Sequence, residues 1–349
     1  MIATAWVIML MIGIFGAISG SSRQAQFRGL LLGLAFFIIF LFAGTRSIGT
    51  DQDSVAYSVY YSIDDRVLSR IVEPTFLLIR NATEAISADN GLRYLLLFYA
   101  LLGVSLKLAA ILQLTSLRWL SVATYFSSYF FLHEFTQIRA AIASGLILLS
   151  VKHIQERNPF QFTVLVSLAS LFHFSALIAF PLYLLGARGL TNGSKTFIAL
   201  AVPLGILIRV LDVNLLYVVP LETVRSKVDV YMEAESLRDV KLNVFNAVYL
   251  VKYALLYALL LMSSRIEPNW RFFSVSLKIY ALSLFAYLAL SYNSTFAIRI
   301  SELFGVIEVV LIPSLYFGMR SKPAAVVIIS SLAVGNLMLS LYQTKLILA

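Results

Sequence analysis

Residues 28–44, RGLLLGLAFFIIFLFAG, decide the fold of this chain. After one arginine the stretch has no charge, and it has the roughly 17 to 25 residues that a helix needs to cross a bilayer. Similar apolar runs continue almost end to end through the 349 residues, of which 60% are hydrophobic and 13% charged. Soluble domains average about 25% charged residues. The composition therefore excludes an ordinary soluble protein and indicates one integral membrane domain over residues 1–349.

The apolar runs predict an all-α polytopic membrane protein with about twelve transmembrane helices. The first run has the hydrophobicity of a signal peptide, but no positive segment precedes it and further runs follow, so we expect a retained helix. Residues 160–187 form either one long helix or a broken pair, and His173 favours the break because ionisable groups tend to lie at an interface or cavity. The predicted spans are 2–19, 28–44, 93–115, 118–133, 137–152, 160–173, 174–187, 195–211, 243–263, 271–291, 298–318 and 323–343.

The distribution of charge predicts the orientation of these spans. If the loop at 20–28 is cytoplasmic and the spans alternate, the cytoplasmic connections hold eleven basic and two acidic residues, which is the whole formal net charge of +9. Positive charge accumulates on the cytoplasmic side of membrane proteins. Both termini and the long loops 45–92 and 212–242 are therefore predicted to lie outside, and the charges at helical spacing in 212–242 favour a surface helix there. The basic composition reflects topology and does not indicate nucleic-acid binding.

The residue inventory narrows the chemistry. The absence of cysteine excludes disulfides and thiol catalysis, and three histidines argue against a multi-histidine metal site. Nucleotide-binding glycine loops and HExxH or GxSxG motifs are absent, which argues against a nucleotide-driven pump or an intramembrane metalloprotease. We expect no metal and no cofactor.

The predicted topology gathers polar residues at the outer leaflet from distant parts of the chain. The planar arginine fork suits phosphate oxygens, which predicts a diphosphate site. Histidine or a carboxylate can accept a proton from an alcohol, and tyrosine rings can stack on sugars. The residues in question are Arg46, Asp51, Asp53, Tyr57, Tyr60, Tyr61, His133, Glu134, Gln137, Arg139, His173, Arg299 and Glu302.

Structural roles compete with these functional ones. An arginine at the outer end of a span is more often an interfacial anchor, and Arg299 and Glu302, three residues apart on a helix, are as consistent with a salt bridge as with catalysis. Lysines within spans are costly unless paired. A pair between Glu308 and either Lys252 or Lys278 is therefore the preferred explanation for these charges.

Four blocks together resemble the EpsG/Wzy-like family of bacterial polysaccharide polymerases. The run GTRSIGTD at 44–51, with Tyr57 and then EPTF at 73–76, resembles the family pattern of R-x-x-G-x-D, a tyrosine and a glutamate. The runs QIRAAIA at 137–143 and LASLFHFSAL at 168–177 resemble two further family blocks, and Arg299 before an apolar span also fits. The resemblance extends from about residue 40 to residue 318.

The resemblance implies a GT-C-like glycosyltransferase that joins oligosaccharide repeat units carried on undecaprenyl diphosphate at the outer face of the bacterial inner membrane. In this interpretation Arg46, Arg139 and Arg299 bind the diphosphate, and His173 is the base, with Glu73 or His133 as alternatives. Asp51 and Glu73 can instead orient the arginines or bind acceptor hydroxyls. The residues predicted to bind sugar or orient others are Asp51, Asp53, Tyr57, Gln137 and Glu302.

Two other classes of function stay open from the sequence. A flippase for the same lipid-linked units would place ionisable groups near the bilayer midplane and often shows repeat symmetry, whereas the polar groups here gather at one leaflet. An O-antigen ligase or an acyltransferase would share the outward site. The partners implied are lipid-linked oligosaccharides and the bilayer, with a chain-length regulator as an open further partner and no nucleic acid.

Overall fold

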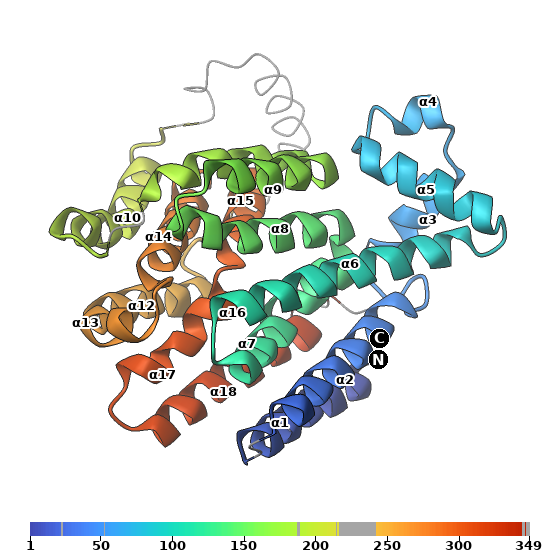
Figure 1. The fold of residues 1–349 in the computed structure, drawn as a ribbon. Coiled ribbons are helices and arrows are strands. Elements are labelled where there is room, and N and C mark those ends of the chain that lie inside the picture. The colour runs from blue at the N-terminus through green and yellow to red at the C-terminus, as the bar shows by residue number, and fades with distance from the viewer. Residues whose placement is uncertain are drawn as a thin grey trace.

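A computed structural model describes residues 1–21, 24–51, 53–186, 189–213, 215, 242–343 and 346, and its regular elements are helices (Figure 1). Most of the predicted outer loop 212–242, with its expected surface helix, lies outside these ranges. The helices are α1 (Ile2–Ser21), α2 (Ala25–Gly44), α3 (Ser54–Ser62), α4 (Asp65–Leu68), α5 (Pro74–Ile86), α6 (Gly91–Leu114), α7 (Arg118–Tyr125), η1 (Phe126–Thr136), α8 (Ile138–Gln155), α9 (Pro159–Phe172), η2 (Phe174–Leu185), α10 (Asn192–Val210), α12 (Ala247–Leu261), α13 (Ser263–Ile266), η4 (Glu267–Asn269), α14 (Phe273–Ala289), α15 (Ser294–Gly305), α16 (Glu308–Leu311), η5 (Ile312–Ser314), α17 (Leu315–Gly318), α18 (Lys322–Met338) and η6 (Leu339–Gln343).

Helices occupy each of the twelve segments predicted from hydropathy, and the polytopic membrane class is supported. Within the described residues, six helices are long and apolar enough to cross a membrane, or seven if the bent pair Ala247–Leu261 and Ser263–Asn269 counts as one span. The other predicted spans are shorter or interrupted helices, as in 298–318, which is divided among α15, α16, η5 and α17. The lengths therefore do not confirm the predicted number of about twelve.

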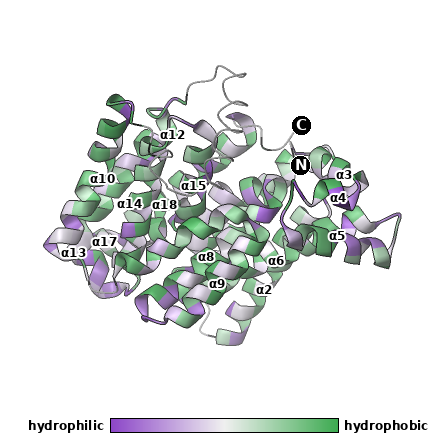
Figure 2. Cartoon of the chain, turned by 90° about the horizontal axis from the view of Figure 1, so that it is seen from above, coloured by the Kyte–Doolittle hydropathy of each residue, from purple (hydrophilic) through white to green (hydrophobic). Residues whose placement is uncertain are grey.

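Helices α8 and α14 lie at the centre of the molecule. In α8, 78% of the apolar window is buried, whereas only 22% is buried in α1 and in α10. Nearly every residue of α14 is also buried. Figure 2 shows hydrophobic residues along the length of α2 and α10 and hydrophilic residues around α13, as expected for helices that face lipid along their sides. The burial of α8 fixes the position of its first turn.

The chain breaks at His173, as the sequence predicts. His173 has an extended backbone conformation (φ −151°, ψ 109°), which ends α9, and the 3₁₀ helix η2 starts at the next residue. Asn158 begins α9 by accepting a hydrogen bond from the backbone N–H of Gln161, with Pro159 in the first turn. The break between α9 and η2 leaves the side chain of His173 partly exposed.

Segment η1 is π-helical, a form that is rare over more than one turn and often found at functional sites. Phe126, Phe130, Phe131 and Phe135 of η1 are buried and pack with Phe42 of α2, with ring centroids 5.0–6.2 Å apart. This aromatic packing and the contacts of its last turn stabilise η1. The π-helical turns set where its last carbonyl groups point.

Charges inside the helical bundle are paired, as their cost in an apolar environment requires. Lys107 of α6 lies 2.8 Å from Glu134 of η1, and both side chains are fully buried. Lys252 of α12 lies 2.9 Å from Glu308 of α16, which confirms the preferred interpretation of this lysine from the sequence. Lys278 instead donates to the carbonyl of Leu185 at 3.1 Å.

Helices α3, α4 and α5 project beyond one end of α6 and form a small polar layer there (Figure 1). They come from the predicted outer loop 45–92. Arg80 of α5 and Asp65 of α4 form an ion pair that joins these two helices. We call this end of the molecule the α3–α5 end, and the candidate site lies there.

Candidate functional site

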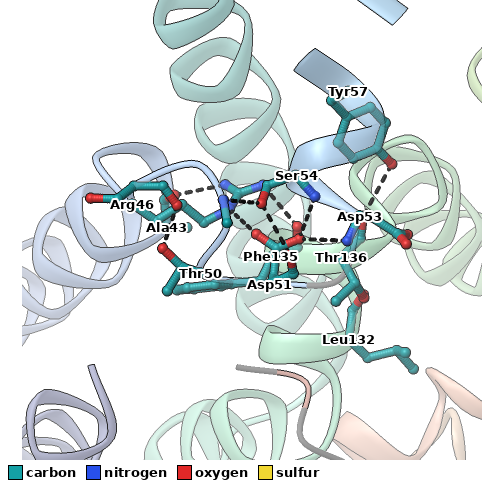
Figure 3. Close-up of polar contacts among 12 residues, drawn as sticks. Ala43, Arg46, Thr50, Asp51, Asp53, Ser54, Tyr57, Leu132, Phe135 and Thr136 are labelled. Carbon is teal, nitrogen blue, oxygen red and sulfur yellow. Dashed lines mark hydrogen bonds and ion pairs between the residues drawn. The ribbon is translucent and has the colours of Figure 1, made fainter. Parts of the chain in front are cut away.

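Arg46 and Asp51 form a buried ion pair at the α3–α5 end, with the side chains of both residues 0% exposed (Figure 3). The guanidinium Nε donates to Asp51 at 3.1 Å, one terminal nitrogen donates to the carbonyl of Ala43 at 2.8 Å, and the other donates to the carbonyl of Phe135 at 2.8 Å. Arg46 also lies over the Phe135 ring. Its fork is thus directed into the protein, where it connects α2 to the end of η1.

Asp51 also fixes the start of α3. Its second carboxylate oxygen accepts from the backbone N–H groups of Asp53 at 3.0 Å and Ser54 at 2.8 Å. These bonds satisfy amides at the first turn of a helix, where no intrahelical partner exists. Asp51 therefore couples the position of Arg46 to that of Asp53.

Tyr57 of α3 closes the end of η1. Its hydroxyl donates to the carbonyl of Thr136 at 3.0 Å (Figure 3). The residue is 4% exposed, and its ring packs on Tyr60 and Phe76. Burial raises the pKa of Tyr57 to about 12, so the phenol stays protonated and able to donate. The ring has no exposed face for a sugar. Arg46 and Tyr57 thus donate to two carbonyl groups at the end of η1, those of Phe135 and Thr136.

Glu73 joins three segments of the chain. The carboxylate accepts from the guanidinium of Arg139 in an ion pair and from the backbone N–H of Phe174 at 3.1 Å, and it lies 3.4 Å from Nδ1 of His173. Residues Glu73, Arg139 and His173 come from the start of α5, the first turn of α8 and the break after α9. Three residues predicted separately from the sequence are therefore in contact, and we call them the clamp.

The charge of Glu73 is strongly stabilised. Burial raises the pKa of this carboxyl, but the interaction with the nearby His173 ring and the charge of Arg139 outweigh burial and lower the pKa to about 2. A carboxylate that accepts several hydrogen bonds from cationic and amide donors is a weak base. The clamp residues keep 14–20% of their side-chain surface exposed, so a ligand can reach them.

Asp53 interacts electrostatically with two of the predicted arginines. Burial raises its pKa and the charge of Asp51 adds to the rise, while Arg139 and Arg299 act in the opposite direction. Both arginines are therefore within electrostatic reach of one carboxylate, although α8 and α15 are far apart in the chain. Arg299 is exposed, and the first turn of α8, where Arg139 lies, is the positive end of the helix dipole.

Gln137 and Glu302 complete the group. The amide Nε2 of Gln137, at the start of α8, donates to Oε2 of Glu302 at 3.3 Å. Asn293 begins α15 by accepting from the backbone N–H of Phe296, which places Arg299 and Glu302 in the second and third turns of the helix. The structure thus brings Glu302 of α15 to the start of α8. The sequence predicts this convergence of distant segments.

Two further residues, His133 and Tyr99, do not belong to the clamp. His133 is 1% exposed in η1, and its Nδ1 lies 3.2 Å from the hydroxyl of Ser144. Tyr99 of α6 packs on Phe76 and Phe172, and its hydroxyl interacts electrostatically with the clamp. Nothing in the sequence distinguishes Tyr99 from the other 17 tyrosines.

The arrangement suits an anionic ligand with hydroxyl groups nearby. Two arginines and a helix start supply positive charge, while Asp53 and Glu302 supply acceptors beside them. Within the ranges that the structure describes, no group of three His, Cys, Asp or Glu side chains lies close enough to hold a metal ion.

The fold and this site define a polytopic helical membrane protein with a charged site at one end of its helices. The sequence model of the EpsG family matches residues 29–346, nearly the whole chain. The chain therefore belongs to the EpsG family, whose members are polysaccharide polymerase-like, and the family prediction from the four blocks is confirmed. No curated protein and no solved structure matches the chain.

Proposed function

We propose that this protein is a GT-C-like glycosyltransferase that polymerises oligosaccharide repeat units carried on undecaprenyl diphosphate at the outer face of the bacterial inner membrane. The observation that carries the proposal is the clamp, in which Glu73 holds Arg139 at the first turn of α8, where Arg139 and Arg299 both interact electrostatically with Asp53. The planar guanidinium group donates two parallel hydrogen bonds to phosphate oxygens. A lipid-linked donor suits the outside of the cell, where no sugar nucleotides are available.

Arg139 and Arg299 carry the diphosphate in this proposal. In the transfer step, negative charge develops on the leaving diphosphate as its bond to the anomeric carbon breaks, and donors held in place beforehand stabilise that charge most effectively. Glu73 prevents Arg139 from swinging away, and His173 in turn orients Glu73. Diphosphate is a good leaving group, so positioning supplies much of the acceleration.

Arg46 receives a different role from the one predicted from sequence. Its three donor directions are occupied by Asp51 and two backbone carbonyls, so binding a diphosphate would break a buried ion pair. We assign Arg46, Asp51 and Tyr57 the task of holding α3 and η1 in place, which positions Asp53 and the start of α8. His133, buried behind Ser144, has no exposed route to a ligand and supports η1.

A second candidate function is a flippase for the same lipid-linked units. The ion pairs Lys107–Glu134 and Lys252–Glu308 inside the bundle favour it, because transporters place ionisable groups at membrane depth. Full burial of the first pair fits a structural role better than a translocation path. A ligase that uses the same outward site is the third candidate.

The glycans of a deletion strain distinguish these functions. Loss of the polymerase leaves a single repeat unit on the lipid carrier and on the final acceptor, which appears as one short band on a gel. Loss of a flippase removes all glycan from the outer face, and loss of a ligase leaves long chains on the carrier. We expect the single-repeat band, restored to a ladder by the wild-type protein.

A further inference from the structure

The carboxylates at the site differ in how firmly their charge is held. Glu73 accepts from an arginine and a backbone amide and contacts His173, and Asp51 accepts from Arg46 and two amides. By contrast, the hydrogen bond that Glu302 accepts comes from the neutral amide of Gln137 at 3.3 Å. A carboxylate without a tight cationic partner retains more of its basicity.

Glu302 also lies close to the groups proposed to hold the donor. It follows Arg299 by three residues on α15, so both side chains lie on one face of that helix. Through its hydrogen bond with Gln137, the N-cap of α8, Glu302 reaches the start of the helix whose first turn carries Arg139. A donor diphosphate held by the two arginines would therefore lie at the end of α8 where Glu302 meets Gln137.

We propose that Glu302 is the base that accepts the proton of the acceptor hydroxyl, with Gln137 orienting its carboxylate, an inference that rests on the polymerase function proposed above. The acceptor oxygen forms a bond to the anomeric carbon of the donor while its proton passes to Glu302. The bond between that carbon and the diphosphate oxygen breaks, and the diphosphate leaves with the electron pair. Glu302 then returns the proton to water.

Two cations interact electrostatically with Glu302, Lys252 of α12 and Arg299 of its own helix. Lys252 lies 2.9 Å from Glu308 and over the rings of Tyr129 and Tyr249. Its main ionic partner is therefore Glu308 and not Glu302. The titratable or charged groups that interact electrostatically with Glu302 are Lys252, Arg299, Tyr129, Tyr249 and Tyr287.

Asp53 is the competing acid, and its surroundings assign it to the donor side. It interacts with Arg139 and Arg299 together, the two groups that would hold the diphosphate. A base in that position would face the leaving group and not the attacking hydroxyl. Asp53→Asn is expected to change donor binding, whereas Glu302→Gln is expected to spare it.

The test uses the purified full-length protein in lipid nanodiscs with lipid-linked repeat units, and measures donor binding and single-turnover transfer separately. Glu302→Gln should bind donor within twofold of wild type and transfer about 10²–10⁴-fold more slowly, the usual contribution of a general base. Glu302→Ala should regain transfer in the presence of formate, a small carboxylate that can take the proton. Glu84→Gln, an exposed glutamate of α5, is the matched control and should transfer at the wild-type rate.

Each result bears on one of the two proposals. Absence of polymer from wild type would overturn the polymerase function, whereas normal polymer with Glu302→Gln within twofold of wild type would overturn only the assignment of the base. Formate rescue of Asp53→Ala but not of Glu302→Ala would move the base to Asp53.

Rates are normalised to the fraction of protein that binds donor. The transfer rate of Glu302→Asp, which keeps a carboxylate, should exceed that of Glu302→Gln by at least about tenfold. Equal rates for these two variants would also overturn the assignment.

Discussion

Glu73 and Arg139 form an ion pair that joins the start of α5 to the first turn of α8, 66 residues further along the chain. Because Glu73 also accepts from the backbone of Phe174, the ion pair fixes the break after α9 as well. The orientation of Arg139 is thus determined by two segments outside its own helix. Substitutions of Glu73 and of Arg139 should therefore affect activity and stability to different extents.

Replacing Arg139 by lysine should remove most of the polymer. Lysine keeps the charge but lacks the planar fork that binds two phosphate oxygens at once. We expect transfer to fall at least about tenfold, equivalent to roughly 1.4 kcal/mol or more. The measurement is the glycan ladder at matched protein levels, with Arg70→Lys, an exposed arginine of the predicted outer loop 45–92, as the control. A wild-type ladder from well-expressed Arg139→Ala would remove Arg139 from the site.

Glu73→Gln should change how stability depends on pH. The pKa of Glu73 is lowered from 4.5 to about 2, so its ionised form stabilises the fold above about pH 4.5. That contribution is lost as the pH falls from 4.5 towards 2, and on the order of 3 kcal/mol is at stake. Thermal unfolding in detergent should show wild type losing its advantage over the variant in this window. A constant difference at all pH values would contradict the lowered pKa.

His173→Gln should retain transfer within a few-fold, because glutamine can still donate to Glu73 although it cannot act as a base. His173→Ala should be less stable, since the contact that orients Glu73 is lost. Single-turnover transfer and thermal unfolding separate the two effects. A loss of about 10²–10⁴-fold in His173→Gln would instead support His173 as the base, the role predicted for it from sequence.

Removing one member of the buried pair Lys107–Glu134 should be far more harmful than removing both charges. Lys107→Met leaves an uncompensated carboxylate in an apolar environment and should cost about 3–5 kcal/mol. The double variant Lys107→Met/Glu134→Gln should recover most of that loss, because glutamine can still accept from Tyr125. Unfolding in mixed micelles measures both, and exposed Lys195→Met should be within about 0.5 kcal/mol of wild type.

The orientation in the membrane can be tested with single cysteines, since the chain has none of its own. Ala88→Cys lies in the predicted outer loop and Asn269→Cys in a predicted inner connection, and both positions are exposed. An impermeant maleimide should label Ala88→Cys in intact cells and Asn269→Cys only after lysis. The reverse pattern would invert the topology and place the clamp in the cytoplasm.

Features that depend on composition or on neighbouring residues could be predicted from the sequence. The helical segments follow from hydropathy, and the break at His173 follows from one ionisable residue between apolar runs. The pairing of Lys252 with Glu308 follows from the cost of charge in lipid. The number of spans could not be predicted, because breaks such as those between α15 and α17 occur inside continuous apolar sequence.

Features that depend on long-range packing could not be predicted in detail. Arg46 and Arg139 are the same type of residue in the sequence. In the structure, the carbonyl of Phe135 in η1 accepts from Arg46, which points inward, whereas Arg139 stays partly exposed. The π-helical form of η1 has no sequence pattern of its own. It is specified by the packing of Phe42 of α2 on Phe135 and by the ion pair of Glu134 with Lys107, which lies 27 residues earlier in the chain.

The buried ion pairs also have a consequence for the biogenesis of this protein. Lys107 and Glu134 are 27 residues apart on consecutive arms of one helical hairpin, so the lysine meets its partner as soon as the next helix is inserted. The two charges then enter the lipid as a neutral unit. Lys252 has to wait until α14 and α15 have followed, because its partner Glu308 comes after both. A nascent chain that stops before residue 308 would therefore carry an unneutralised lysine in the bilayer, a state that membrane quality control can recognise and degrade.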